Sequence, residues 1–182
     1  MIAHMKNPLM VPAVLLGLLA GCGEEPAPAS DDATAPDSTE DAQMANDTAS
    51  DADTFIAEQQ AFLEANAGRD GVVLRDSGLQ YRVLEEGSGA SPAPESLVTV
   101  HYKGALVDGT VFDSSYNRGQ PAQFPASQLI KGWVEALQLM KEGDKWELVI
   151  PAELGYGERG AGGLIPPNAT LVFEVELISV DG

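Results

Sequence analysis

Alternating apolar and polar residues in the second half of the chain predict several β-strands. In such a segment every second side chain lies on the same face, so one face can be buried while the other meets water. Four segments alternate clearly: residues 79–84, 98–103, 146–150 and 171–177. The pair Asp108-Gly109 is a hairpin signal and predicts that neighbouring strands run antiparallel.

Two helices are predicted from apolar residues at helical spacing. The segment 132–140 carries several apolar residues and lies between strand segments. Antiparallel strands around one short helix predict an α+β fold, a half-barrel wrapped around that helix. A short helix over residues 53–67 precedes the strands and ends at Gly68. We expect its apolar stripe to pack on the following domain, and the stripe consists of Phe55, Ile56, Phe62 and Leu63.

Residues 23–53 have a composition that predicts disorder. The segment contains ten acidic residues and no Lys, Arg or aromatic residue. Such a chain cannot bury enough apolar surface to offset the entropy lost on ordering. We therefore expect residues 22–53 to form a disordered acidic linker, either a spacer or simply a solubilising segment.

The first residues have the pattern of a bacterial export signal. Lys6 supplies a positive charge, and residues 9–20 form a nearly continuous apolar run that is short for a membrane-spanning helix. The run ends in Leu-Ala-Gly-Cys at residues 19–22, which resembles the lipobox of bacterial lipoproteins. The resemblance implies that residues 1–21 are removed and that Cys22 is acylated, whereas the alternative is an ordinary signal peptide followed by an incidental cysteine.

Lipidation of Cys22 would place the protein on a membrane through its acyl chains, since several chains give stable anchoring. The residue after the cysteine is glycine rather than aspartate, which is compatible with the outer membrane, facing the periplasm. The expected organisation is a signal peptide, a lipidated linker, a short helix and one folded domain, over residues 1–21, 22–53, 54–70 and 71–182.

Charge and cysteine content narrow the function classes. The formal net charge of −18 argues against nucleic acid as a partner, because phosphate binding needs clustered Lys and Arg. The same charge disfavours electrostatic docking on anionic lipid. With one cysteine, the chain cannot form an intramolecular disulfide or a cysteine-based zinc site.

Motifs of hydrolases and metalloenzymes are missing from the sequence. There is no Gly-rich phosphate loop and no Gly-x-Ser-x-Gly elbow. Of the two histidines, His4 lies in the signal and His101 lies on the polar face of a predicted strand. We therefore expect no metal and no cofactor.

Aromatic residues stand beside predicted turns, strand ends and the helix start. Taken alone they would simply be core residues, but their sequence contexts indicate more. The informative segments are 101–104 (HYKG), 108–115 (DGTVFDSS), 129–133 (LIKGW), 154–157 (LGYG) and 165–175 (IPPNATLVFEV). In order and spacing, these segments resemble the FKBP family of peptidyl-prolyl cis–trans isomerases over about residues 77–180, and residues 77–81 (SGLQY) resemble its bacterial macrophage-infectivity-potentiator branch.

The resemblance implies an enzyme that accelerates isomerisation of X-Pro bonds in proline-containing polypeptides, during the folding of exported proteins. It also implies an aromatic pocket with Trp133 as the floor under the proline ring. The walls implied in this way are Tyr102, Phe112, Phe124, Ile130 and Phe173.

Polar groups of the implied pocket act on the substrate amide. Asp113 would lie beside the twisting amide and hydrogen-bond Tyr102, and Arg118 would pair with Asp113. The Tyr156 hydroxyl would donate to a substrate carbonyl. Ile165 would line the rim and offer its backbone N–H to the substrate.

Two further classes compete with the enzyme: a periplasmic chaperone or binding module on the same fold, and a purely structural lipoprotein. A degenerate pocket would favour the chaperone or binding module, whereas a purely structural lipoprotein would have no reason to keep an aromatic pocket in this register. The resemblance also implies macrolide ligands, but Ala122 replaces an aromatic wall residue of many eukaryotic members, which bears on macrolide affinity more than on activity. We expect a monomer, because an acidic linker occupies the space where dimeric members carry a long helical domain.

Overall fold

The computed structural model describes residues 39–181, with side chains from Asp51 onward. The expected signal peptide, the lipidation of Cys22 and the first part of the linker lie outside these residues. Within residues 39–181, no helix is both long enough and apolar enough to cross a membrane.

Helix α1 runs from Thr39 to Ala67, so it begins well before the position that we predicted. The prediction of disorder up to Asp53 was therefore wrong from Thr39 onward. An apolar stripe is the pattern that predicts a helix, and the chain has none before Phe55. However, the segment has several alanines and no Pro or Gly, which favours helix, and acidic residues in its first turn suit the helix dipole.

In the described part of the chain seven strands form one antiparallel sheet, and the predicted α+β class is confirmed. Its order is β1-β2-β6-β7-β3-β4, and β5 pairs with β3 on a separate path. Every paired neighbour is antiparallel. The strands are β1 (Val72–Leu74), β2 (Gln80–Glu85), β3 (Leu97–Leu106), β4 (Val111–Ser114), β5 (Ala122–Pro125), β6 (Lys145–Ile150) and β7 (Leu171–Asp181).

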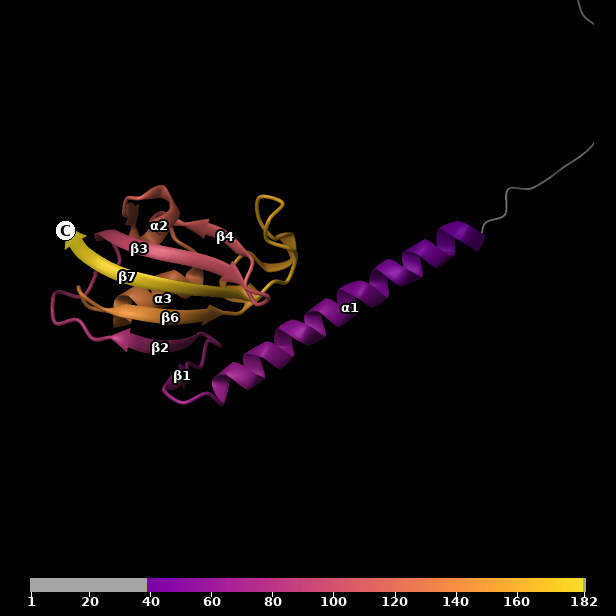
Figure 1. Ribbon diagram of the computed structural model, residues 1–182, viewed down its shortest axis with the longest axis horizontal. Coiled ribbons are helices and arrows are strands. Elements are labelled where there is room, and N and C mark those ends of the chain that lie inside the picture. The colour runs from indigo at the N-terminus through magenta and orange to yellow at the C-terminus, as the bar shows by residue number, and fades with distance from the viewer. Residues whose placement is uncertain (1–38, 182) are drawn as a thin grey trace, which may run out of the picture. The chain divides into compact units, whose positions relative to one another are not determined.

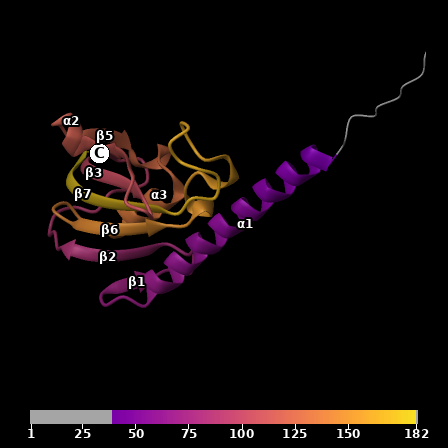
Figure 2. The ribbon, with the colours of Figure 1, turned by 45° about the vertical axis from the view of Figure 1, so that its right-hand side comes forward.

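The helices after α1 are short. Helix α3 (Lys131–Leu139) lies against the sheet, which curves around it (Figures 1 and 2). Helix α2 (Ser115–Arg118) follows β4 directly. Within residues 39–181 there are also three 3₁₀ turns: η1 (Ala126–Gln128), η2 (Ala152–Leu154) and η3 (Gly157–Arg159).

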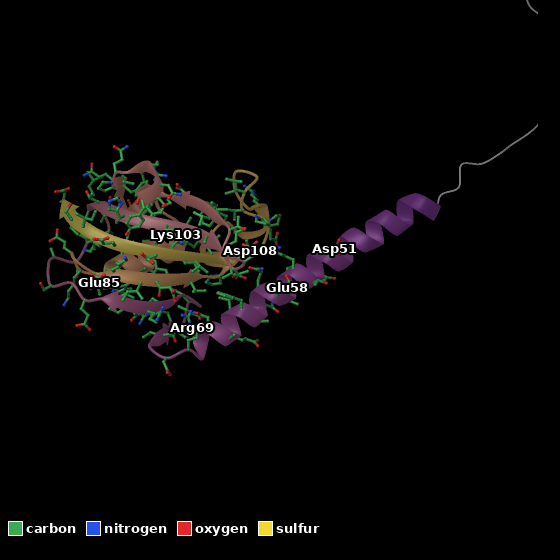
Figure 3. The ribbon with its side chains drawn as sticks, viewed as in Figure 1. Asp51, Glu58, Arg69, Glu85, Lys103 and Asp108 are labelled. Atoms are coloured by element: carbon green, nitrogen blue, oxygen red, sulfur yellow. The ribbon has the colours of Figure 1, made fainter. Side chains whose placement is uncertain are left out.

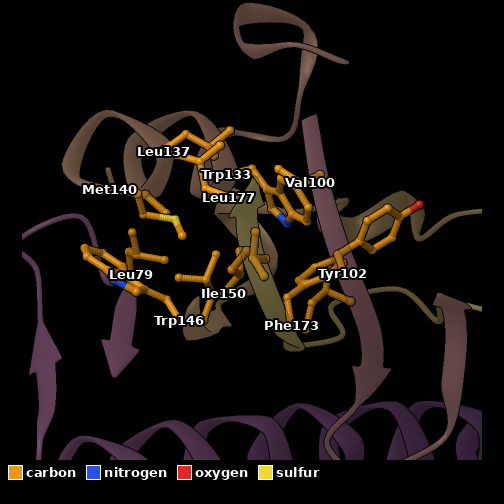
Figure 4. Packing of buried hydrophobic residues seen from close by; sticks show 14 of the residues in the cluster. Leu79, Val100, Tyr102, Trp133, Leu137, Met140, Trp146, Ile150, Phe173 and Leu177 are labelled. Carbon is orange, nitrogen blue, oxygen red and sulfur yellow. The ribbon is translucent and has the colours of Figure 1, made fainter. Parts of the chain in front are cut away.

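The hydrophobic core lies between α3 and the inner face of the sheet (Figure 4). The alternation predicted this face, since Leu148 and Ile150 of β6 are buried in the same core cluster as Leu137 of α3. A Cβ on Gly132 would lie 2.6 Å from Cγ2 of Ile150, so glycine at this position allows α3 to approach β6 closely. Charged side chains such as Glu85, Lys103 and Asp108 are exposed to solvent (Figure 3).

Candidate active site

A cavity of about 230 Å³ opens beside the start of α3. Strands β3, β4, β5 and β7 each contribute a wall, and the turns before α3 and after η2 complete it. Nine residues line it: Tyr102, Phe112, Asp113, Phe124, Leu129, Ile130, Trp133, Tyr156 and Phe173. Eight of these nine were expected to be site residues, and the structure brings them together.

Trp133 is the centre of the aromatic packing. It is 4% exposed, and its ring meets Tyr102 and Phe173 edge to face, with centroid distances of 5.4 and 5.3 Å. Phe112 meets Phe173 in the same way at 5.5 Å. A Cβ on Gly104 would lie 2.6 Å from both of these phenyl rings, so the missing side chain makes room for that pair. Edge-to-face geometry is favoured by the quadrupole of aromatic rings.

One carboxylate reaches this apolar cavity. The Tyr102 hydroxyl donates to Asp113 Oδ2 at 2.5 Å, and Arg118 Nη1 donates to Asp113 Oδ1. Arg118 Nη2 also donates to the Tyr102 hydroxyl at 2.8 Å. The Ser114 side chain caps α2 by accepting from the Asn117 N–H, and this short helix carries Arg118 back toward Asp113.

These contacts determine the charge states of Asp113 and Tyr102. Burial acts to raise the pKa of Asp113, but hydrogen bonds from Tyr102 and Arg118 outweigh it and hold the pKa below its usual value. Burial, together with the bond to Asp113, raises the pKa of Tyr102. Around neutral pH the cavity therefore presents an ionised carboxylate and a neutral phenol.

Tyr156 stands at the open side of the cavity, and 40% of its surface is exposed. Within the described part of the chain, its hydroxyl has no hydrogen-bond partner, which leaves it available to a substrate carbonyl. Donation from this hydroxyl to a substrate carbonyl, which the family resemblance implied, stays a prediction.

The structure corrects the expected role of Ile165. Its side chain is buried in the core and does not line the cavity, and its N–H donates to the Ala161 carbonyl at 3.0 Å. This bond closes a small bridge between the two residues and occupies the N–H that was expected to face substrate.

Two further positions were resolved only by the structure. Leu129 lines the cavity beside Ile130, although its place in the LIKGW segment was the only sequence signal for it. His101 was expected to be structural or solvated, and its Nδ1 lies 2.9 Å from Ser115 Oγ while its ring stacks on Tyr116.

Residues 51–181 hold no group of three or more His, Cys, Asp or Glu side chains that could bind a metal ion.

Comparison with known proteins identifies the class. Residues 89–178 match the family model of the FKBP-type peptidyl-prolyl cis-trans isomerase, and residues 2–83 match the domain amino terminal to this isomerase. The chain belongs to the FKBP-type peptidyl-prolyl isomerase family. The sequence pattern does not predict the amino-terminal match, because the composition of residues 22–53 predicts a linker.

Individual relatives include proteins of Escherichia coli and Legionella longbeachae. It is 60% identical over 126 residues to the FKBP-type 22 kDa peptidyl-prolyl cis-trans isomerase of Escherichia coli, covering 69% of this chain and 61% of that one. It is 53% identical over 124 residues to the outer membrane protein MIP of Legionella longbeachae, covering 68% of this chain and 53% of that one. The chain therefore spans about half to three fifths of the length of these curated relatives.

A solved structure of another isomerase has a similar fold. The crystal structure of a peptidyl-prolyl cis-trans isomerase from Pseudomonas syringae has a TM-score of 0.67 and 39% sequence identity, covering 71% of this chain and 96% of that chain.

Proposed function

We propose that this protein accelerates cis–trans isomerisation of X-Pro peptide bonds in polypeptides, including exported proteins as they fold. The observation that carries the proposal is the aromatic cavity with a single ionised carboxylate at its edge. Eight of its nine lining residues are residues that the family resemblance assigns to the site, and they meet in one place.

The chemistry of the reaction suits such a site. Rotation about an X-Pro bond must cross a barrier of roughly 20 kcal/mol, because the twisted amide loses resonance. The planar amide is the more dipolar form, so water stabilises it over the twisted form. An apolar cavity removes that preference, and each ~1.4 kcal/mol of barrier removed gives a tenfold faster reaction.

The residues have distinct parts in this mechanism. Trp133 supports the proline ring, and Phe112, Phe124 and Phe173 exclude water from the amide. Asp113 faces the amide carbon, and its bonds to Tyr102 and Arg118 keep it ionised and oriented. No covalent bond breaks, so no nucleophile, proton transfer or cofactor is needed.

The test compares two aspartates of the same hairpin region. Asp113→Ala and Asp108→Ala are measured beside wild type, as full chains, by the isomerisation rate of a proline peptide. Asp113 lies in the cavity, whereas Asp108 lies in the exposed turn and accepts from the Thr110 N–H. We expect kcat/KM to fall about tenfold or more for Asp113→Ala, a loss of ~1.4 kcal/mol of transition-state stabilisation, and to stay unchanged for Asp108→Ala.

The same assay separates the enzyme from a binding module. If wild type bound the proline peptide but did not accelerate isomerisation, the fold would serve as a chaperone or binding module.

We further propose that Cys22 is acylated and anchors the protein to a bacterial membrane, with the protein facing the periplasm. The lipobox-like residues 19–22 support this, and one relative is named an outer membrane protein. Radioactive palmitate should label wild type but not Cys22→Ser, which should also leave the membrane fraction or stay unprocessed. Equal labelling of both would contradict lipidation at Cys22.

A further inference from the structure

Four polar residues are buried where α1 meets the folded domain. They are Gln59 and Asn66 of α1, Gln80 of β2, and Thr170, which immediately precedes β7. Their exposed fractions are 4%, 3%, 3% and 1%. Since a buried polar group without a partner costs free energy, the hydrogen bonds of these residues define where the helix docks.

One attachment joins α1 to β2. Asn66 Nδ2 donates to Gln80 Oε1 at 2.8 Å, and Gln80 Nε2 donates to the Leu63 carbonyl at 2.9 Å. Strand β2 contributes no residue to the aromatic cavity. This attachment can therefore stabilise the protein without contacting the aromatic cavity.

The other attachment joins α1 to the chain segment beside the site. The backbone N–H of Thr170 donates to Gln59 Oε1 at 3.0 Å. Gln59 lies about 10.5 Å from Asn66 along the helix, on the same face, because seven residues make almost two turns. The two attachments thus hold one stripe of α1 at two separate points.

Thr170 is the last residue of the segment that returns from Tyr156 to β7. The Asn168 N–H donates to the Gly157 carbonyl at 2.9 Å, so this segment is tied back to the residue after Tyr156. Asn168 has φ of 60°, a left-handed conformation that asparagine tolerates better than most residues with a side chain. A continuous set of hydrogen bonds and short backbone steps leads from Gln59 through Thr170 and Asn168 to Tyr156.

Helix α1 also covers the other end of the same segment. A small cavity of about 80 Å³ lies between the helix and the chain on both sides of the Tyr156 region. Ile56, Gln59 and Leu63 of α1 line it, opposite Ala152 and Glu153, which precede Tyr156, and Asn168 and Thr170, which follow it. The helix therefore contacts both stems of the segment that supplies one wall of the aromatic cavity.

We propose that Gln59 is a positioning residue for Tyr156, so that docking of α1 fixes the position of Tyr156 at the open side of the substrate cavity. The proposal rests on the proposed isomerase function for its kinetic consequence. Tyr156 contacts the substrate in both the planar and the twisted state, so a displaced wall weakens ground-state and transition-state binding alike. Such a change raises KM while kcat stays nearly constant.

Three variants of the full chain, purified in detergent, test this role. Gln59→Leu keeps the approximate shape but removes the acceptor for the Thr170 N–H. Gln59→Glu retains an oxygen that can accept this bond and serves as the conservative rescue. Asn66→Ala is the matched control, because it removes the Asn66–Gln80 hydrogen bond and leaves the bond between Gln59 and Thr170 untouched.

We expect KM for a proline peptide to rise about fivefold in Gln59→Leu, with kcat within about twofold of wild type. Gln59→Glu should keep the wild-type KM, and Asn66→Ala should also keep it although it lowers thermal stability. Equal KM values for Gln59→Leu and Asn66→Ala would overturn the proposal, because helix docking would then contribute stability alone. If Gln59→Leu does not fold, Gln59→Ala takes its place.

Hydrogen exchange provides a readout that does not depend on catalysis. Amides of residues 156–170 should exchange about tenfold faster or more in Gln59→Leu, and at the wild-type rate in Asn66→Ala. Unchanged exchange in Gln59→Leu would refute the positioning role even in an active enzyme. If wild type shows no isomerase activity but Gln59→Leu still exchanges faster, the structural coupling is supported and the proposed function fails.

Discussion

Replacement of Trp133 by alanine tests whether the aromatic cavity is the site of catalysis. Trp133 is almost fully buried, and it supports both Tyr102 and Phe173 through edge-to-face contacts. Truncation of a buried Trp costs about 3–5 kcal/mol, and each aromatic contact contributes about 0.5–1.5 kcal/mol beyond buried area. Trp133→Ala should therefore lose at least about 3 kcal/mol of unfolding free energy, a large part of the 5–15 kcal/mol typical of a domain.

The chain offers a matched control in its second tryptophan. Trp146 is 6% exposed, packs in the same core, and stacks on Tyr81 with a centroid distance of 4.3 Å (Figure 4). It does not line the aromatic cavity. Trp146→Ala should therefore lower the free energy of unfolding by a similar ~3–5 kcal/mol and leave the lining of the aromatic cavity intact.

Urea unfolding and isomerase kinetics of both variants, at a temperature where both are folded, separate stability from catalysis. We expect kcat/KM to fall at least about a hundredfold in Trp133→Ala and to stay within about threefold of wild type in Trp146→Ala. A similar loss of kcat/KM in both variants would refute the reasoning, because a general loosening of the core would then explain the effect of Trp133→Ala.

Three further predictions address the site and the assembly. Tyr156→Phe keeps the ring and should leave the urea midpoint within error while lowering kcat/KM about tenfold; an unchanged kcat/KM with a well-behaved peptide would refute the donor role. Because Asp113 has a depressed pKa in the folded state, its ionised form stabilises the protein above the usual carboxyl pKa near 3.8, and this stabilisation is lost as pH falls through the lower folded value. The difference in urea midpoint between wild type and Asp113→Asn should therefore shrink between pH ~5 and ~2, and a constant difference would contradict the pairing. Sedimentation in detergent at micromolar concentration should show a monomer, and a stable dimer would refute that expectation.

The monomer prediction has lost its original basis. We had expected a linker where dimeric members have a long helix, but α1 begins at Thr39, and residues 2–83 match the amino-terminal domain of the family. Sedimentation therefore decides between a helix that only docks on its own domain and one that also joins two chains.

The sheet could be predicted because its strands alternate. Strand β7 buries every second residue from Leu171 to Leu177, as the pattern indicated. The first half of α1 could not be predicted in this way, since its helix depends on alanine content and the absence of Pro and Gly rather than on an apolar face. Strand β1 (Val72–Leu74) was missed because three residues are too few for a periodic signal.

The site was predicted by sequence motif more than by physical pattern. Aromatic residues alone would have been assigned to the core, and Trp133 and Phe173 are indeed core residues as well as cavity walls. Backbone hydrogen bonds are invisible in a sequence, which is why Ile165 was wrongly expected to donate to substrate. The bond between Gln59 and Thr170 joins residues far apart in the chain, and no local pattern predicts it.

The pH dependence of kcat/KM tests the central claim most directly. In the cavity Asp113 stays ionised and Tyr102 stays neutral across neutral pH, because the pKa of Asp113 is lowered and that of Tyr102 is raised. His101 does not line the cavity. Full-chain protein is measured in a protease-coupled or NMR exchange assay with a proline peptide from pH ~6 to ~8, with and without EDTA. Catalysis by desolvation and shape predicts a clear acceleration with a flat profile that EDTA does not change. A bell-shaped profile near neutrality, loss of activity with EDTA, or no acceleration at all would contradict the account.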